Sequence, residues 1–190
     1  MAVRCLGLLS ICCAGAFVLA AGRGFAQTQR DEYEIKAAFL FNLFLYVDWP
    51  QNALPDNGTF VLGILGPDPF GDHLKELGKR NVKNRPIVFR KFPTVEDIRP
   101  CHMLFIASER GEREGPEERL AKALAKLKGA PVLIVGDTPG LAAKGAAINL
   151  LTEQGASKME ANPEAARRHG LSIRASLLKL ARIVKDQETP

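Results

Sequence analysis

The amino-acid sequence predicts an α/β protein: a single-domain, three-layer sandwich with a mostly parallel central sheet, a late hairpin and a C-terminal helix. Mostly apolar segments of strand length recur at 59–65, 86–92, 102–107 and 131–135, and helical patterns separate them. Strands that alternate with helices in this way indicate a parallel sheet covered on both faces. Near the C-terminus the alternation stops, and two further segments face each other across Gln154-Gly155, which predicts a hairpin over 146–152 and 157–161.

The first element is a predicted helix over residues 31–49, which Pro50 ends. Between residues 35 and 49 it is apolar except for Lys36, Asn42 and Asp48. A helix that is apolar almost all round is buried on several sides, either as a central core helix or with one face on the core and another on a partner. We expect at least one large side chain to be exposed in the monomer and to anchor association, and the candidates are Phe39, Leu40, Leu43, Phe44 and Tyr46.

The remaining helices are predicted from their ends. After the first strand, Asp68 is the expected cap and Pro69 the first residue of a helix that reaches about Leu77. Thr94 and Asp97 form a capping box, and a second helix begins at Pro116 and reaches Lys128.

Two helices close the chain. Asn162 caps a short helix that stops at Gly170, and Ser172 begins the last helix. Its predicted apolar stripe consists of Ile173, Leu177, Leu180, Ala181 and Val184.

Residues 1–26 have the pattern of a cleavable signal peptide. Arg4 precedes an uncharged apolar stretch over 6–21, and Gly24-Phe25-Ala26 supplies small residues before a cut ahead of Gln27. The apolar stretch is shorter than the about 20 residues of a bilayer span, which favours cleavage over an uncleaved anchor. A lipid anchor is disfavoured because Ile11, not a small residue, precedes Cys12. The mature protein is therefore expected to be residues 27–190, one domain in the periplasm.

The charge distribution argues against a nucleic-acid-binding protein, and the cysteine count argues against a domain stabilised by disulfides. Residues 27–190 hold 24 basic and 21 acidic residues, a net charge of +3 with the signs interspersed, whereas nucleic-acid binding shows a concentrated basic footprint. Cys101 is the one cysteine after the signal, so the mature chain cannot form an internal disulfide, and Cys101 is the candidate redox thiol.

No motif predicts catalysis, a metal or a cofactor. His73, His102 and His169 have no metal-ligand spacing, and nucleophile-elbow, Walker and zinc-protease motifs are absent. The turn after the first strand could border a ligand pocket, for which the candidates are Gly66, Asp68, Phe70 and Gly71, although the two prolines favour a plain turn. The Cys101-His102 pair could form an activated thiol, but a buried cysteine is the stronger interpretation.

The order and spacing of several motifs resemble the YfiR-like family of periplasmic regulators over essentially the whole mature domain. The residues that carry the resemblance are 34–39 with Asn42 and Trp49-Pro50, 63–66 with 68–71, 101–106, 135–137, 162–166 with 170–173, and 177–181. The chain departs from the family at Gly145-Ala146, where the family has Gly-Gly, and at Ala175-Ser176, where it has paired serines. Better-known members also use further cysteines in disulfides.

The resemblance implies a non-enzymatic α/β sandwich that binds and restrains an inner-membrane diguanylate cyclase, or another membrane sensor protein, and so lowers cyclic-di-GMP. It also implies an outer-membrane lipoprotein that sequesters the regulator, and a homodimer is a further expectation. Two alternatives remain open. One is a periplasmic small-solute-binding sensor with its ligand near Gly66–Gly71, and the other is a thiol enzyme that uses Cys101 and His102.

Overall fold

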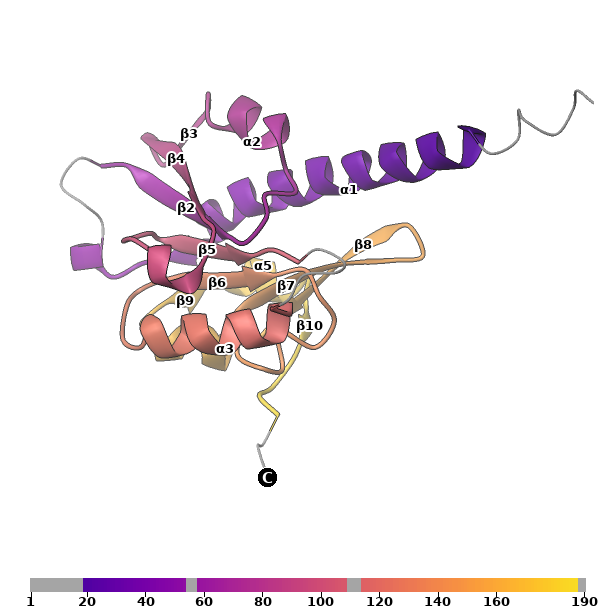
Figure 1. Ribbon diagram of the computed structural model, residues 1–190. Helices are drawn as coiled ribbons and strands as arrows, with labels where there is room; N and C mark the ends of the chain where they lie inside the picture. Colours follow the sequence, from indigo (N-terminus) through magenta and orange to yellow (C-terminus); the bar gives the residue numbers. More distant parts are fainter. Residues whose placement is uncertain (1–18, 54–57, 109–113, 188–190) are drawn as a thin grey trace, which may run out of the picture.

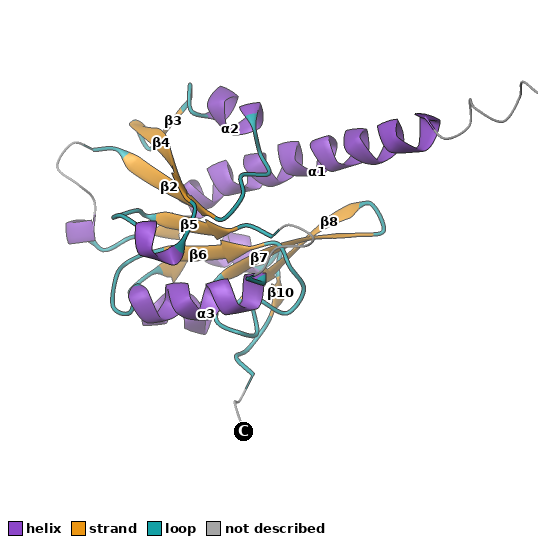
Figure 2. Ribbon diagram, in the orientation of Figure 1, coloured by secondary structure: helices purple, strands orange, loops and turns teal. Residues whose placement is uncertain are grey.

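The structure, a computed structural model, describes residues 19–53, 58–108 and 114–187. Its middle layer is an eight-stranded sheet in the order β10-β8-β7-β6-β5-β2-β4-β3 (Figures 1 and 2). Strands β4, β2, β5, β6 and β7 are parallel, β8 is antiparallel to β7, and β3 is antiparallel to β4. The strands are β2 (Phe60–Leu65), β3 (Asn81–Val82), β4 (Arg85–Phe92), β5 (Met103–Ile106), β6 (Leu133–Gly136), β7 (Ile148–Glu153), β8 (Ala156–Ala161) and β10 (Arg182–Ile183). The predicted α/β class with a mostly parallel sheet is confirmed.

Helices cover both faces of this sheet, so the fold has three layers. One face packs against α1 (Leu19–Tyr46), α2 (Asp72–Leu77), α4 (Pro163–Arg168) and α5 (Ala175–Leu178). The other face packs against η2 (Val95–Asp97) and α3 (Pro116–Lys126). Phe60 and Leu62 of β2 belong to the first core cluster and Val61 to the second, because successive strand residues point to opposite faces. Figure 1 shows α1 on one side of the sheet and α3 on the other, with the N-terminal end of α1 projecting beyond the sheet.

Local signals in the sequence placed several turns and caps correctly. The hairpin turns at Gln154 and Gly155, whose φ angles of 52° and 77° suit a tight two-residue turn. The Thr94–Asp97 capping box is present, and the Asn162 side chain caps α4 by accepting a hydrogen bond from the Ala165 N–H at 3.0 Å. The short hairpin of β3 and β4, which turns at Lys83 and Asn84 with φ of 50° and 62°, was not predicted.

Two helix boundaries differ from the prediction. Helix α1 ends at Tyr46, before Trp49, because Val47–Asp48 (β1) pairs antiparallel with Ser172–Ile173 (β9) in a separate two-stranded sheet. Helix α2 begins at Asp72, so Asp68 is not its cap; the Asp68 carboxylate accepts a hydrogen bond from the Phe70 N–H at 2.9 Å and stabilises the preceding turn instead.

The C-terminal helix is present but is only one turn long. Its flanking residues pair with strands on both sides: Ile173 pairs with Val47, and Arg182–Ile183 pairs with Glu160–Ala161. Because these pairings interrupt the helix, the predicted stripe does not form, and Leu180 lies on the turn between α5 and β10. The first 18 residues of the predicted signal peptide lie outside the described residues, and its end, 19–26, forms the first turns of α1.

Candidate functional site

One face of α1 is apolar although it points to solvent. Ile35, Ala38, Asn42 and Tyr46 are exposed and recur every three or four residues, which places them on one side of the helix. The partly buried side chains of Phe39 and Leu45 flank this row. We call these six residues the α1 outer stripe. Ile35 and Tyr46, its large exposed members, have 47% and 37% of their surface in solvent, and Asn42 is its one polar member.

The five residues predicted to bind a partner divide between the core and this stripe. Leu40, Leu43 and Phe44 are 0–1% exposed and pack in the core, so they offer no surface to a partner of the folded protein. Phe39 is partly buried and Tyr46 is exposed. The expected exposed aromatic is therefore present as Tyr46, and its role in association stays a prediction. Ile35 was not among the candidates, although its helical spacing from Asn42 and Tyr46 could have identified it.

A buried polar cluster holds the middle of α1 against the sheet. Lys36, 4% exposed, lies with its Nζ 3.0 Å from Asp137 Oδ2 and 2.5 Å from Glu32 Oε1. The Tyr33 hydroxyl donates to Asp137 Oδ2 at 3.0 Å, and Ser108 Oγ donates to Asp137 Oδ1 at 3.4 Å. Burial, followed by the nearby Asp137 charge, raises the pKa of Tyr33, so its hydroxyl remains a donor. Since Ser108 and Asp137 follow β5 and β6, the cluster clamps α1 to the carboxyl ends of these strands.

A second set of contacts fixes the C-terminal end of α1. The Trp49 indole N–H donates to the His102 carbonyl at 3.1 Å, and its ring stacks on Phe44 with centroids 5.6 Å apart. Arg174 forms an ion pair with Asp48 at 2.9 Å, and its hydrogen bond lowers the pKa of that carboxyl. The two sets of contacts therefore fix the part of α1 that carries the outer stripe, from residue 33 to its C-terminal end.

The residues predicted to border a ligand pocket lie at the carboxyl edge of the sheet. In the sheet, the strand order is β6-β5-β2-β4, so the connection from β2 runs to β4 on one side and the connection from β5 runs to β6 on the other. Open α/β sheets commonly bind ligands between two strands whose connections diverge in this way. Phe70 is 1% exposed and packs on Phe105 in the core. Asp68 forms an ion pair with Lys91 at 2.8 Å. Gly66 and Gly71 supply φ angles of +95° and +55° to the turn.

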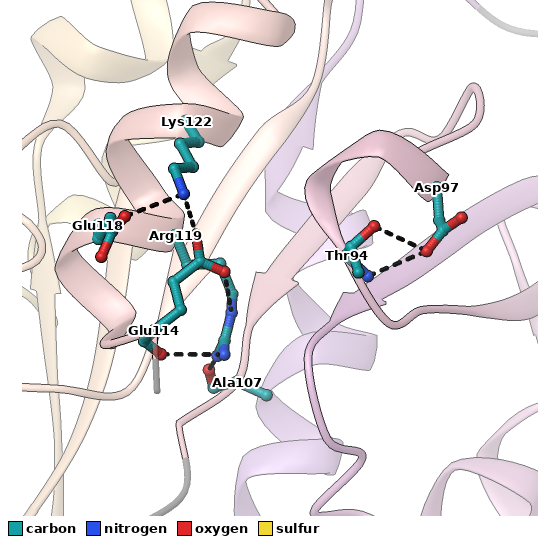
Figure 3. Close-up of polar contacts among 7 residues, drawn as sticks. All are labelled: Thr94, Asp97, Ala107, Glu114, Glu118, Arg119 and Lys122. Carbon is teal, nitrogen blue, oxygen red and sulfur yellow. Dashed lines mark hydrogen bonds and ion pairs between the residues drawn. The ribbon is translucent and has the colours of Figure 1, made fainter. Parts of the chain in front are cut away.

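A buried arginine packs against this turn at the carboxyl edge. Arg119, 4% exposed, reaches from α3, and its guanidinium donates to the Ala107 carbonyl and, at 3.2 Å, to the Glu114 carbonyl (Figure 3). A Cβ atom at Gly66 would lie 2.7 Å from Arg119 Nη1, so the glycine makes room for the guanidinium. Lys122 extends the network to Glu114 and Glu118 at 2.7 and 2.9 Å. The Arg119 guanidinium therefore lies against Gly66, one of the predicted pocket residues, and the solute-binding role of this edge stays a prediction.

Cys101 and His102 lie at the opposite, amino edge of the sheet. They border a hollow of about 320 Å³ together with Thr59, Val88 and Arg90. Burial raises the pKa of the Cys101 thiol to about 12, and burial also lowers the pKa of His102. The His102 Nδ1 atom accepts a hydrogen bond from the Val61 N–H at 3.0 Å. Burial therefore favours the protonated thiol, and the imidazole is engaged by the backbone, in agreement with a buried cysteine.

The described residues contain neither a candidate metal cluster nor a membrane-spanning helix. Within 19–53, 58–108 and 114–187, no three His, Cys, Asp or Glu side chains are grouped so that they could hold a metal ion. No helix in these ranges has the length and apolarity to cross a membrane.

A family model described as YfiR/HmsC-like matches residues 33–182. The chain belongs to the YfiR/HmsC-like family. No curated protein sequence matches it significantly. The similar solved structures include an ABC domain in complex with L-Trp from Streptococcus pneumoniae, at 10% identity and a TM-score of 0.45, over 66% of this chain and 55% of that one. They also include a conserved domain protein from Vibrio cholerae, at 13% identity and a TM-score of 0.49, over 80% and 60%. The chain therefore spans between half and two thirds of the length of these proteins.

In this YfiR/HmsC-like chain, the motifs that carry the resemblance contact one another. Lys36 of the first motif pairs with Asp137 of the fourth, and Trp49 binds the backbone of His102. Asn162, fully buried, donates to the Ala142 carbonyl and to Asp186, both at 2.8 Å. These motif residues therefore hold the fold together.

Proposed function

We propose that this protein is a periplasmic, non-enzymatic regulator that binds a membrane signalling protein through the α1 outer stripe and restrains it. The partner we propose is an inner-membrane diguanylate cyclase or a similar membrane sensor. Membership of the YfiR/HmsC-like family supports the regulatory role, and the predicted signal peptide supports the periplasmic location. The observation that carries the binding role is the exposed apolar face of α1.

An ordinary surface helix presents charged or polar side chains to water. Between Ile35 and Tyr46, α1 instead exposes Ile35, Ala38 and Tyr46, with only Asn42 polar among the exposed residues. Apolar residues spaced by three, four and seven along a helix suit docking into an apolar groove of another protein. The contacts that fix this part of α1 lower the entropic cost of such docking, because the helix is ordered before it binds.

This surface also accounts for the proposed regulation. A cyclase that buries the stripe would be held in its inactive state, and cyclic-di-GMP would stay low. An outer-membrane lipoprotein that competes for the regulator would release the cyclase. A second copy of the chain could cover the same stripe in the free state, in which case the homodimer and the complex would exclude each other.

The test is capture of the partner by the exported protein. The double variant Ile35→Glu with Tyr46→Glu should weaken capture of the partner's periplasmic domain at least tenfold while the circular dichroism spectrum is unchanged. The matched control is Val88→Glu, which places the same acid at an apolar side chain of β4 that is 43% exposed. Equal capture by the stripe variant and the wild type would refute the proposal.

A further inference from the structure

The most exposed large apolar side chains of the described residues lie in the C-terminal segment, far in sequence from the α1 outer stripe. Leu180 is 78% exposed and Ile183 is 52% exposed. Leu180 lies on the turn between α5 and β10, and Ile183 lies on β10, the edge strand of the eight-stranded sheet. An exposed leucine on a turn projects into solvent instead of covering a neighbouring element.

Positive charge is concentrated in the same segment. Residues 174–187 contain Arg174, Lys179, Arg182 and Lys185 but one acidic residue, Asp186. Asp186 is engaged by Arg168 and by Asn162. Arg174 and Arg182 form ion pairs with Asp48 and Glu160, whereas Lys179 and Lys185 form none with the described residues. Two lysines are thus available to an external anion on either side of Leu180 and Ile183.

We propose that the C-terminal surface formed by Lys179, Leu180, Ile183 and Lys185 docks onto an anionic phospholipid membrane. Leu180 and Ile183 enter the boundary between headgroups and acyl chains, where their apolar surface leaves water. Lys179 and Lys185 lie at the level of the phosphates and are attracted by the negative surface potential. We assign an anionic membrane to this surface because Lys179 and Lys185, which have no ion-pair partner among the described residues, are both positive and flank the exposed Leu180 and Ile183 in sequence.

This inference rests on the proposed function for its setting and adds a location to it. A regulator of a membrane protein gains from being held at the bilayer, because confinement to the surface raises its effective concentration near the partner. With few inserted side chains the attachment is weak and reversible, so the protein can also exchange between partners.

Vesicle co-sedimentation tests the proposal with exported protein whose N-terminus has been checked by mass spectrometry. The vesicles contain either phosphatidylglycerol with phosphatidylcholine or phosphatidylcholine alone. We expect binding to the anionic vesicles only, and a reduction of binding by raised salt. The variants Leu180→Asp with Ile183→Asp, and Lys179→Glu with Lys185→Glu, should each bind at least tenfold more weakly. No wild-type binding, or unchanged binding of both variants, would overturn the proposal.

Two controls separate this proposal from the partner site. The Ile35→Glu, Tyr46→Glu variant carries the same type of change on α1 and should bind anionic vesicles like the wild type, whether or not it captures the partner. Without vesicles, the Leu180→Asp, Ile183→Asp variant should still capture the partner's soluble periplasmic domain. Loss of that capture, with vesicle binding retained, would make the C-terminal surface a protein interface and overturn the lipid assignment.

Discussion

Replacing Lys36 by Met tests the buried cluster that clamps α1 to the sheet. Met keeps most of the volume of the lysine stem but removes the charge that faces Asp137. Lys36 is 4% exposed as a residue and the Asp137 side chain is 2% exposed, so water cannot replace the lost ammonium. Asp137 then keeps only the hydroxyls of Tyr33 and Ser108 as described partners. Breaking a buried pair by removing one partner costs about 3–5 kcal/mol, and we expect a loss of unfolding free energy in this range.

The assay is equilibrium unfolding in urea, followed by far-UV circular dichroism. A second variant, Lys36→Met with Asp137→Leu, removes both charges and should recover most of the loss, less about 1 kcal/mol for the Tyr33 hydroxyl that loses its acceptor. The control is Lys75→Met, whose ion pair with Asp72 lies at the surface and should contribute little. A loss of unfolding free energy below about 1 kcal/mol for Lys36→Met would refute the reasoning. So would a double variant whose loss equals the sum of the losses measured for Lys36→Met and for Asp137→Leu alone.

Three further predictions concern other parts of the chain. Burial raises the pKa of Cys101 from 9.0 to about 12, so thiol reagents should label the native protein slowly at pH 8. The stability that the protonated thiol contributes is complete below pH 9 and is lost as the pH rises towards 12. Cys101→Ala should therefore reduce the fall in unfolding free energy between these pH values, measured by urea unfolding. Asn162→Ala removes the α4 cap and leaves the Ala142 carbonyl without its amide donor, and it should lower stability by about 2–3 kcal/mol in thermal unfolding. Asn162→Asp should lose at least as much, because its carboxylate keeps the cap but faces the Ala142 carbonyl and Asp186 without a donor. Mass spectrometry of the exported protein should show a chain that starts at or near Gln27, and an intact Met1 terminus in the inner membrane would contradict the signal peptide.

The sequence by itself determined the elements whose causes are local. The apolar segments that became β2, β5 and β6 are buried on both faces, as their composition predicted. The hairpin at Gln154-Gly155, the capping box and the Asn162 cap all depend on residues within a few positions of one another, so a short window of sequence contains the whole interaction.

Tertiary structure decided what depends on distant partners. Helix α1 ends at Tyr46 because β1 pairs with β9, and the ion pair that joins these segments links residues 126 positions apart. The Lys36–Asp137 pair spans 101 positions, and the single-turn α5 reflects strand pairing that overrides a helical apolar pattern. The same effect divides α1: its sequence is apolar almost all round, and only packing against the sheet determines that Leu40 and Phe44 are core while Ile35 and Tyr46 face solvent. Burial depends on which surfaces the whole chain brings together, and a one-dimensional pattern does not contain that information.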